Sequence, residues 1–296
     1  MIFIADERVL RGVPATITKQ FLDQDGDAVD PGVVTIGITK ANGTTLVASG
    51  TATSGTGTSP RTYAMAAVST MEWLTATWTS STHGAQQSSV EVVSGYYFTV
   101  AQARTHKTAG MADTTTYPTA AIQSARAEVE AEFERYCWPF VPRYRRETIA
   151  AKGNSPSLIL PDQCVRTLRS VTELGTDGLA ANTWSTGDLA ATQVDANGVL
   201  TRLSGDVWAR CNHIIEYEYG WSSPPADVLD AIMTRLRYRM NTQRSAIPDR
   251  STSITVDGAG TYGLLVPGRG TSLTAQPEID VILNDPRYRR PVTGLA

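Results

Sequence analysis

Two short glycine-containing motifs have residue types and spacing that could bind an ion or a nucleotide. The segment DQDGD at residues 23–27 offers three carboxylates, but an EF-hand loop requires Gly and Glu where this chain has Ala28 and Val34. The segment DGAGTYG at residues 257–263 matches GxGxxG, but Pro267 breaks the helix whose amide dipoles would hold a pyrophosphate. We therefore expect a β-turn and a flexible loop, with no bound metal and no cofactor.

The residues that could act as nucleophiles, bases or metal ligands do not form a recognisable set. The sequence has no GxSxG, no HxxxH, no CxxC and no lysine in a phosphate-binding loop. The three cysteines, Cys137, Cys164 and Cys211, are widely spaced, and the three histidines are His83, His106 and His213. We expect His213 to be a packed core residue and the protein not to be an enzyme.

Arginine residues are more informative, because residues 105–296 contain 18 of them among 20 basic residues, against 21 acidic residues. Arginine favours planar, hydrogen-bonded pairing with carboxylates, which is typical of interfaces. One group follows the first predicted helix, a second lies on the long helix, and a third flanks Tyr288 in NDPRYRRP. Tyr and Arg dominate interface hot spots, so we expect the tail to dock on a partner. A solvated face remains the alternative for the helix pair.

Length and charge exclude several classes of protein. A chain of 296 residues can form two domains, and its formal charge of −3 gives neither half the character of a basic nucleic-acid module. The start MIFIADERVLRG has too few apolar residues for a signal peptide, and no apolar run is long enough to span a membrane. We expect a protein that is neither exported nor membrane-spanning, in a reducing compartment.

The elements expected from hydropathy divide the chain into two domains of an α+β protein. Residues 1–104 contain short alternating runs separated by turn clusters, which predict an immunoglobulin-like β-sandwich. A linker is expected over 105–116. In residues 117–276, helices near 118–137 and 224–244 are expected to flank a β-rich insert. The predicted C-terminal segment, 277–296, has a short helix and an arm.

Four segments of the second half follow one another in a characteristic order across residues 113–291. They are YPTAAIQSARAEVEAEFERYCWPFVP, LILPDQCVRTLRSVTELG, IIEYEYGWSSPPADVLDAIMTRLRYRM and PEIDVILNDPRYRRP. This pattern resembles the head-to-tail connector proteins, or adaptors, of long-tailed (siphovirus-type) bacteriophages, particularly those of actinobacteria. The N-terminal half matches no motif of that family and looks like an added domain.

The resemblance implies a structural virion protein of the neck, assembled in the host bacterial cytoplasm. Such adaptors form a closed ring under the portal, matching its twelve-fold symmetry, and extend the channel for double-stranded DNA. The implied partners are other copies in a dodecameric ring, the portal protein, downstream neck or tail proteins, and DNA that passes without sequence-specific binding. No membrane partner is implied.

The same resemblance assigns roles to segments of this chain. The two long helices would form the ring, and residues 277–296 would be the portal-binding arm. A ring requires two different complementary faces on each subunit, and the acidic first helix and the arginines could supply them. The ring-interface candidates are Glu128, Glu132, Arg143, Arg145, Arg235 and Arg239. The arm candidates are Ile279, Ile282, Leu283, Arg287, Tyr288, Arg289 and Arg290.

Two other readings of the sequence remain open. One is a different neck or tail component, such as a head-completion stopper or a tail terminator. The other is a carbohydrate-binding adhesin built on the sandwich. Its sugar platform would consist of Trp73, Trp78, Tyr96 and Tyr97, although aromatic residues at alternating strand positions are more often core.

Overall fold

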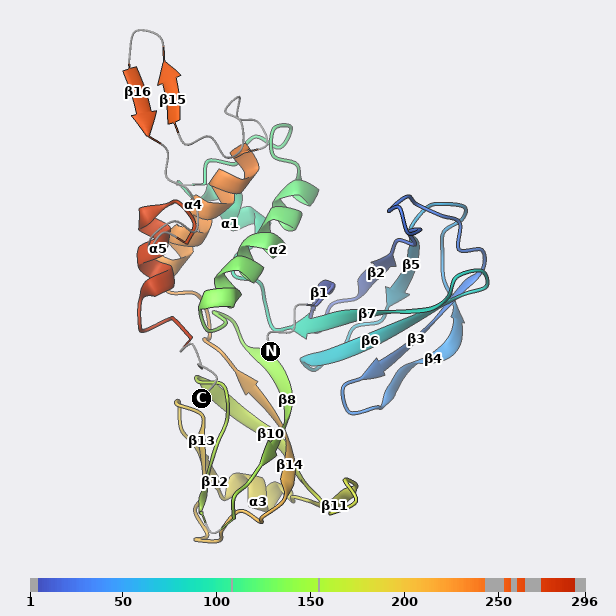
Figure 1. The fold of residues 1–296 in the computed structure, drawn as a ribbon, viewed down its shortest axis with the longest axis vertical. Coiled ribbons are helices and arrows are strands. Elements are labelled where there is room, and N and C mark those ends of the chain that lie inside the picture. Colours follow the sequence, from blue (N-terminus) through green and yellow to red (C-terminus); the bar gives the residue numbers. More distant parts are fainter. Residues whose placement is uncertain are drawn as a thin grey trace. The chain divides into compact units, whose positions relative to one another are not determined.

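The computed structural model describes residues 5–107, 109–153, 155–242, 253–256, 260–263 and 273–290. It is an α+β protein whose chain divides into two compact units, each built from two separate segments (Figure 1). The β unit comprises Met1–Gly95 and Pro142–Gly220, and the helical unit comprises Tyr96–Val141 and Trp221–Ala296. The chain therefore passes three times between the units.

The region predicted to be a linker, residues 105–116, contributes to a core. Helix α1 (Val100–Thr105) precedes it, with Thr99 and Gln102 forming a capping box. Ala109 and Met111 are 1% and 0% exposed and belong to the apolar core of the helical unit. The structure thus separates the units after Gly95, whereas the sequence places the boundary at residue 104.

The N-terminal part of the β unit, called the sandwich below, consists of two sheets that share one core. The larger has the order β1-β7-β6-β3-β4, with β1 parallel to β7, and the smaller pairs β2 with β5. Ile17 and Met65 of the smaller sheet pack in one cluster with Ile36 and Trp78 of the larger. The immunoglobulin-like topology stays a prediction. The strands are β1 (Glu7–Leu10), β2 (Ala15–Lys19), β3 (Val34–Lys40), β4 (Thr45–Ala52), β5 (Arg61–Met65), β6 (Glu72–Ser80) and β7 (Gly84–Val93).

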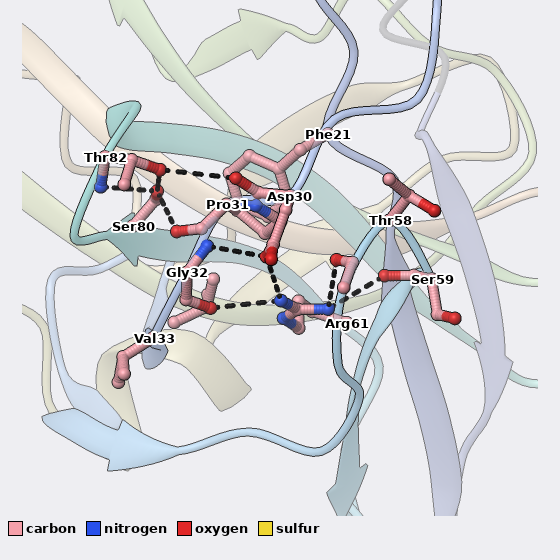
Figure 2. Close-up of polar contacts among 12 residues, drawn as sticks. Phe21, Asp30, Pro31, Gly32, Val33, Thr58, Ser59, Arg61, Ser80 and Thr82 are labelled. Atoms are coloured by element: carbon pink, nitrogen blue, oxygen red, sulfur yellow. Dashed lines mark hydrogen bonds and ion pairs between the residues drawn. The ribbon is translucent and has the colours of Figure 1, made fainter.

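One buried arginine organises the loops at an end of the sandwich. Arg61, 2% exposed, donates to the carbonyl oxygens of Gly57, Ser59 and Gly32 at 3.2, 3.0 and 3.0 Å (Figure 2). It also donates to the carboxylate of Asp30 at 3.1 Å. Because one guanidinium satisfies acceptors from two loops, the Gly/Ser/Thr-rich segment before β5 is held in place.

The second part of the β unit, called the β-insert below, also has two sheets around one core. Their orders are β11-β10-β14-β8 and β12-β13-β9. Trp184 and Trp208 stack at 4.8 Å between ring centres in this core, and Ile215 and Tyr217 of β14 are fully buried. Its elements are β8 (Arg143–Ala150), β9 (Ser157–Ile159), β10 (Val165–Leu174), β11 (Ala180–Thr183), α3 (Thr186–Ala190), β12 (Thr192–Val194), β13 (Val199–Arg202) and β14 (Asn212–Tyr219).

The helical unit is formed by α1, α2 (Thr119–Tyr136), α4 (Ala226–Thr242) and α5 (Pro277–Asn284). Helix α2 ends before Pro139, which disfavours helical geometry in the residue that precedes it. Helix α4 starts directly after Pro224 and Pro225, where missing amide hydrogens cost no intrahelical bond. Its apolar stripe, including Val228, Ile232 and Leu236, packs in one cluster with residues of α2 and α5.

A hairpin of β15 (Ser253–Val256) and β16 (Gly260–Gly263) lies between α4 and α5 in the chain. Gly260 and Gly263 of the GxGxxG match therefore belong to an antiparallel strand. A dinucleotide site would need a helix to begin inside that motif.

Candidate assembly surface

The helix charges predicted to face a neighbouring subunit are joined to one another inside the helical unit. Glu132 of α2 accepts hydrogen bonds from Arg235 Nε at 2.8 Å and Arg235 Nη2 at 2.6 Å. It also accepts from Arg239 Nη2 at 3.3 Å. Glu128 lies 3.5 Å from Arg239 Nη1. This pairing connects α2 to α4 within one chain. The charges therefore have partners without a second copy of the protein.

Arg235 is the centre of this cluster. Its side chain is 8% exposed and that of Glu132 is 14% exposed. Its Nη1 also donates, at 3.4 Å, to Thr274 O and to Gln276 Oε1, just before α5. One guanidinium therefore links α2, α4 and the start of α5. Only Glu128 and Arg239 of the four helix candidates have substantial exposure, at 56% and 39%.

The other two ring-interface candidates, Arg143 and Arg145, lie on β8 in the β unit. Arg145 Nη1 donates to both carboxylate oxygens of buried Asp162, at 3.0 and 2.9 Å, and its Nε donates to Glu147 at 2.7 Å. The Tyr217 hydroxyl donates to the same Asp162 at 2.7 Å. Burial, and then the Asp162 charge, raise the pKa of Tyr217, so the hydroxyl keeps its proton. Arg145 is thus bound to carboxylates of its own chain, and Arg143 is buried.

The apolar arm candidates face the core of their own unit. Ile279 and Leu283 of α5 are fully buried, and Ile282 packs against the same cluster. Asp280 fixes the preceding loop by accepting from Thr274 N at 2.9 Å and Thr274 Oγ1 at 2.8 Å. Val281, by contrast, is 67% exposed. Helix α5 is thus part of the helical core and presents one large apolar side chain outward.

Tyr288 closes this core after α5. It is 4% exposed, and its ring lies edge-on to Phe140 and Trp221, with centroid distances of 5.6 Å in each case. Its hydroxyl donates to the carboxylate of Asp227, in the first turn of α4, at 3.0 Å. Tyr288, which was predicted to contact a partner, therefore packs inside its own chain.

The arginines around Tyr288 differ in their surroundings. Arg289 forms an antiparallel bridge with Cys137, and Arg290 N donates to Tyr136 O at 2.9 Å, which fastens the end of α2. The guanidinium of Arg290 also lies 5.0 Å from the Trp138 ring. Arg287 is 66% exposed and pairs with Asp285. Of the arm candidates, Arg287 is the one that extends to the surface, and residues 291–296 lie outside the described part.

Two buried glutamates were missed by the sequence pattern, which places them on a solvated flank of α2. Glu130 is fully buried and accepts from Tyr97 N at 2.8 Å. Glu134, 9% exposed, accepts from the Tyr97 hydroxyl at 3.0 Å. Arg126 lies nearby and stacks on Tyr96 at 3.4 Å from the ring centre. These contacts hold the chain in place where it enters the helical unit. In the sequence, the adjacent tyrosines Tyr96 and Tyr97 are the feature that could have indicated them.

The aromatic residues proposed as a sugar platform do not form one. Trp78 is fully buried and donates from its indole to Ser88 Oγ at 2.9 Å. Tyr97 is 3% exposed in the helical core, and Tyr96 stacks with Arg126. Trp73 is the remaining residue of the four, and its side chain is half-buried.

The residues singled out as possible metal-binding or catalytic groups have local structural contacts. Asp23 accepts from the amides of Asp25 and Asp27, both at 2.9 Å, and Gly26 has a φ of 89°, as in a turn. His213 is fully buried, and desolvation lowers its pKa. Within the described ranges, no group of three or more His, Cys, Asp or Glu residues is placed to hold a metal ion, and no helix is long and apolar enough to cross a membrane.

Comparison with solved structures finds distant structural likenesses. No protein-family model matches the chain, and no curated protein matches its sequence. Among solved structures, the chain is similar to one from an assembly described as the neck of an empty GTA particle computed with C6 symmetry. The two share 15% identity with a TM-score of 0.39, over 53% of this chain and 83% of the other.

Proposed function

We propose that this protein is a structural component of the neck of a bacteriophage-like particle, acting as a head-to-tail adaptor. It would assemble as a ring next to the portal and extend the channel for double-stranded DNA. No catalytic step is part of this role. One observation carries the proposal: three of the four segments that resemble connector proteins, far apart in sequence, meet in one hydrophobic core.

The geometry of that core supports the proposal. Ile122 and Phe133 of α2, Ile232 of α4 and Leu283 of α5 are all fully buried in it. The Glu132–Arg235 pair and Tyr288 add polar links between the same elements. A connector subunit needs rigid helices, because each interface is repeated around the ring and must close with fixed geometry.

The near-neutral charge of residues 105–296 agrees with a passive channel. Each exposed cation facing a ring lumen is repeated in every subunit, and neutralised phosphates make DNA binding tighter and more salt-dependent. The 20 basic and 21 acidic residues of this half balance, and Arg145 and Arg235 are paired with carboxylates of the same chain. DNA could then pass without being held.

The portal contact proposed for the C-terminal arm now rests on fewer residues. Ile279, Leu283 and Tyr288 support the helical core, so deleting residues 277–296 would remove core side chains as well as any contact surface. The outward residues Val281 and Arg287 are 67% and 66% exposed and are better candidates. They can be changed without opening the core.

The experiment compares Val281→Asp with Leu179→Asp, a change at a β-insert residue that is 68% exposed. Both variants should keep the wild-type circular dichroism spectrum. We expect Val281→Asp to weaken cosedimentation with purified portal and Leu179→Asp to leave it intact. Binding to tail-tube protein in place of portal would favour a tail terminator, and equal portal binding by both variants would remove the arm from the proposal.

A further inference from the structure

Arg169 is the extra residue of a β-bulge on β10. Its neighbours Leu168 and Ser170 pair with consecutive residues of β14, so that Arg169 itself has no partner in the register. A bulge re-aims the side chain of its extra residue. Here the guanidinium Nη1 donates to the backbone carbonyl oxygen of Met71, directly before β6, at 2.6 Å. The β-insert is thereby bonded to the sandwich.

Arg169 has further partners on both sides of this contact. Its Nε donates to Glu218 of β14 at 2.8 Å, and its Nη1 lies 3.9 Å from the carboxylate of Glu72 on β6. Its guanidinium lies 5.1 Å from the ring of Tyr144, which is 2% exposed. The side chains of Arg169, Glu218 and Glu72 are 19%, 18% and 12% exposed. Charges so poorly exposed are weakly screened, so their pairing matters.

A second cluster joins the same two parts. Glu91 of β7 accepts from Arg8 Nε at 2.8 Å and lies 3.7 Å from Arg143 of β8. The side chains of Glu91 and Arg143 are 6% and 3% exposed. Ser94 Oγ, at the end of the sandwich, donates to Pro142 O at 3.0 Å. Sandwich carboxylates therefore meet β-insert arginines at two independent places.

We infer that the sandwich and the β-insert form one mechanical body, held together by Arg169 and Glu91, and that the sandwich is an integral part of the protein. Without the sandwich, Arg169 would lose Met71 O and Glu72, and Arg143 would lose Glu91. The hydrogen bond and the ion pairs that place the sandwich against the β-insert would then be lost. This inference is independent of the proposed neck function, because it concerns contacts within one chain.

The test is hydrogen exchange on the full-length variant Arg169→Met, which keeps side-chain bulk and removes the charge. Arg146→Met is the matched control, since Arg146 lies on β8 and pairs with Glu216 at 3.2 Å, away from the sandwich residues named above. We expect amides at the start of β6 to exchange roughly ten- to hundredfold faster in Arg169→Met, with α2 and α4 unchanged.

Wild-type exchange at β6 in Arg169→Met, or equal acceleration in Arg146→Met, would overturn the inference. Should Arg169→Met fail to fold, Glu91→Gln takes its place, with faster exchange expected in β7 and β8. In calorimetry, the wild-type sandwich and β-insert should unfold in one transition, and the variant should show two. Separate transitions already present in the wild type would also contradict a single body.

Discussion

Removing the carboxylate of Glu132 tests whether α2 and α4 are held together inside one chain. Glu132→Ala deletes two hydrogen bonds from Arg235, at 2.8 and 2.6 Å, and one from Arg239 at 3.3 Å. Arg235, with its side chain 8% exposed, would keep only the two 3.4 Å contacts to Thr274 O and Gln276 Oε1 among those described. It would then be a poorly solvated, under-satisfied cation.

The expected loss follows from these geometries. Breaking a buried ion pair by removing one partner costs about 3–5 kcal/mol, whereas an exposed pair contributes about 0–1 kcal/mol. Because Glu132 retains 14% exposure and Arg235 retains two weak acceptors, we expect a loss of about 2–4 kcal/mol. The double variant Glu132→Met with Arg235→Met should recover most of it, since apolar side chains of similar size carry no buried charge.

The assay is urea unfolding followed by circular dichroism at a helix band, because the two longest helices, α2 and α4, lie in the helical unit. Glu128→Ala is the matched control, as that side chain is 56% exposed, and it should cost less than about 1 kcal/mol. A loss below about 1 kcal/mol for Glu132→Ala, combined with loss of oligomers, would show that Glu132 acts at a subunit interface and not within one chain.

Three further predictions concern the β unit. The lowered pKa of His213 means that the fold favours its neutral form, so stability should fall as pH drops below about 6.5. His213→Gln should remove that loss in pH-dependent melting, whereas exposed His83→Gln should keep it. Asp162→Ala should cost about 3–5 kcal/mol in urea unfolding, because Asp162 is 2% exposed, whereas Asp206→Ala at a surface pair should cost under about 1 kcal/mol. Cys164 has a φ of 56°, so Cys164→Asn should raise the unfolding free energy by about 0.5–1 kcal/mol, and an unchanged midpoint would contradict strain there.

The ends and faces of the long helices could be predicted because they depend on local chemistry. Pro139 limits α2, and Pro224 and Pro225 precede the first turn of α4, so these boundaries follow from the missing amide hydrogen and ring sterics. The apolar spacing of Ile122 and Ile232 likewise identifies their buried faces. The strand-rich character of residues 1–104 follows from alternation in the same way.

The partners of the charged residues could not be predicted, because they lie in segments that are distant in the sequence. Helical spacing places Arg235 beside the apolar stripe but does not say that Glu132, far away in sequence, will meet it. Glu130 looks solvated in a row of glutamates until Tyr97 is placed against it. The division of the β unit into two separate segments is equally non-local, since alternation identifies strands but not their partners.

Electron microscopy of the purified full-length protein, with and without purified portal, tests the proposal that it is a ring-forming neck adaptor. We expect closed rings, alone or on the portal, with the symmetry of the portal they contact. A protein that stays strictly monomeric and does not associate with the portal would contradict it.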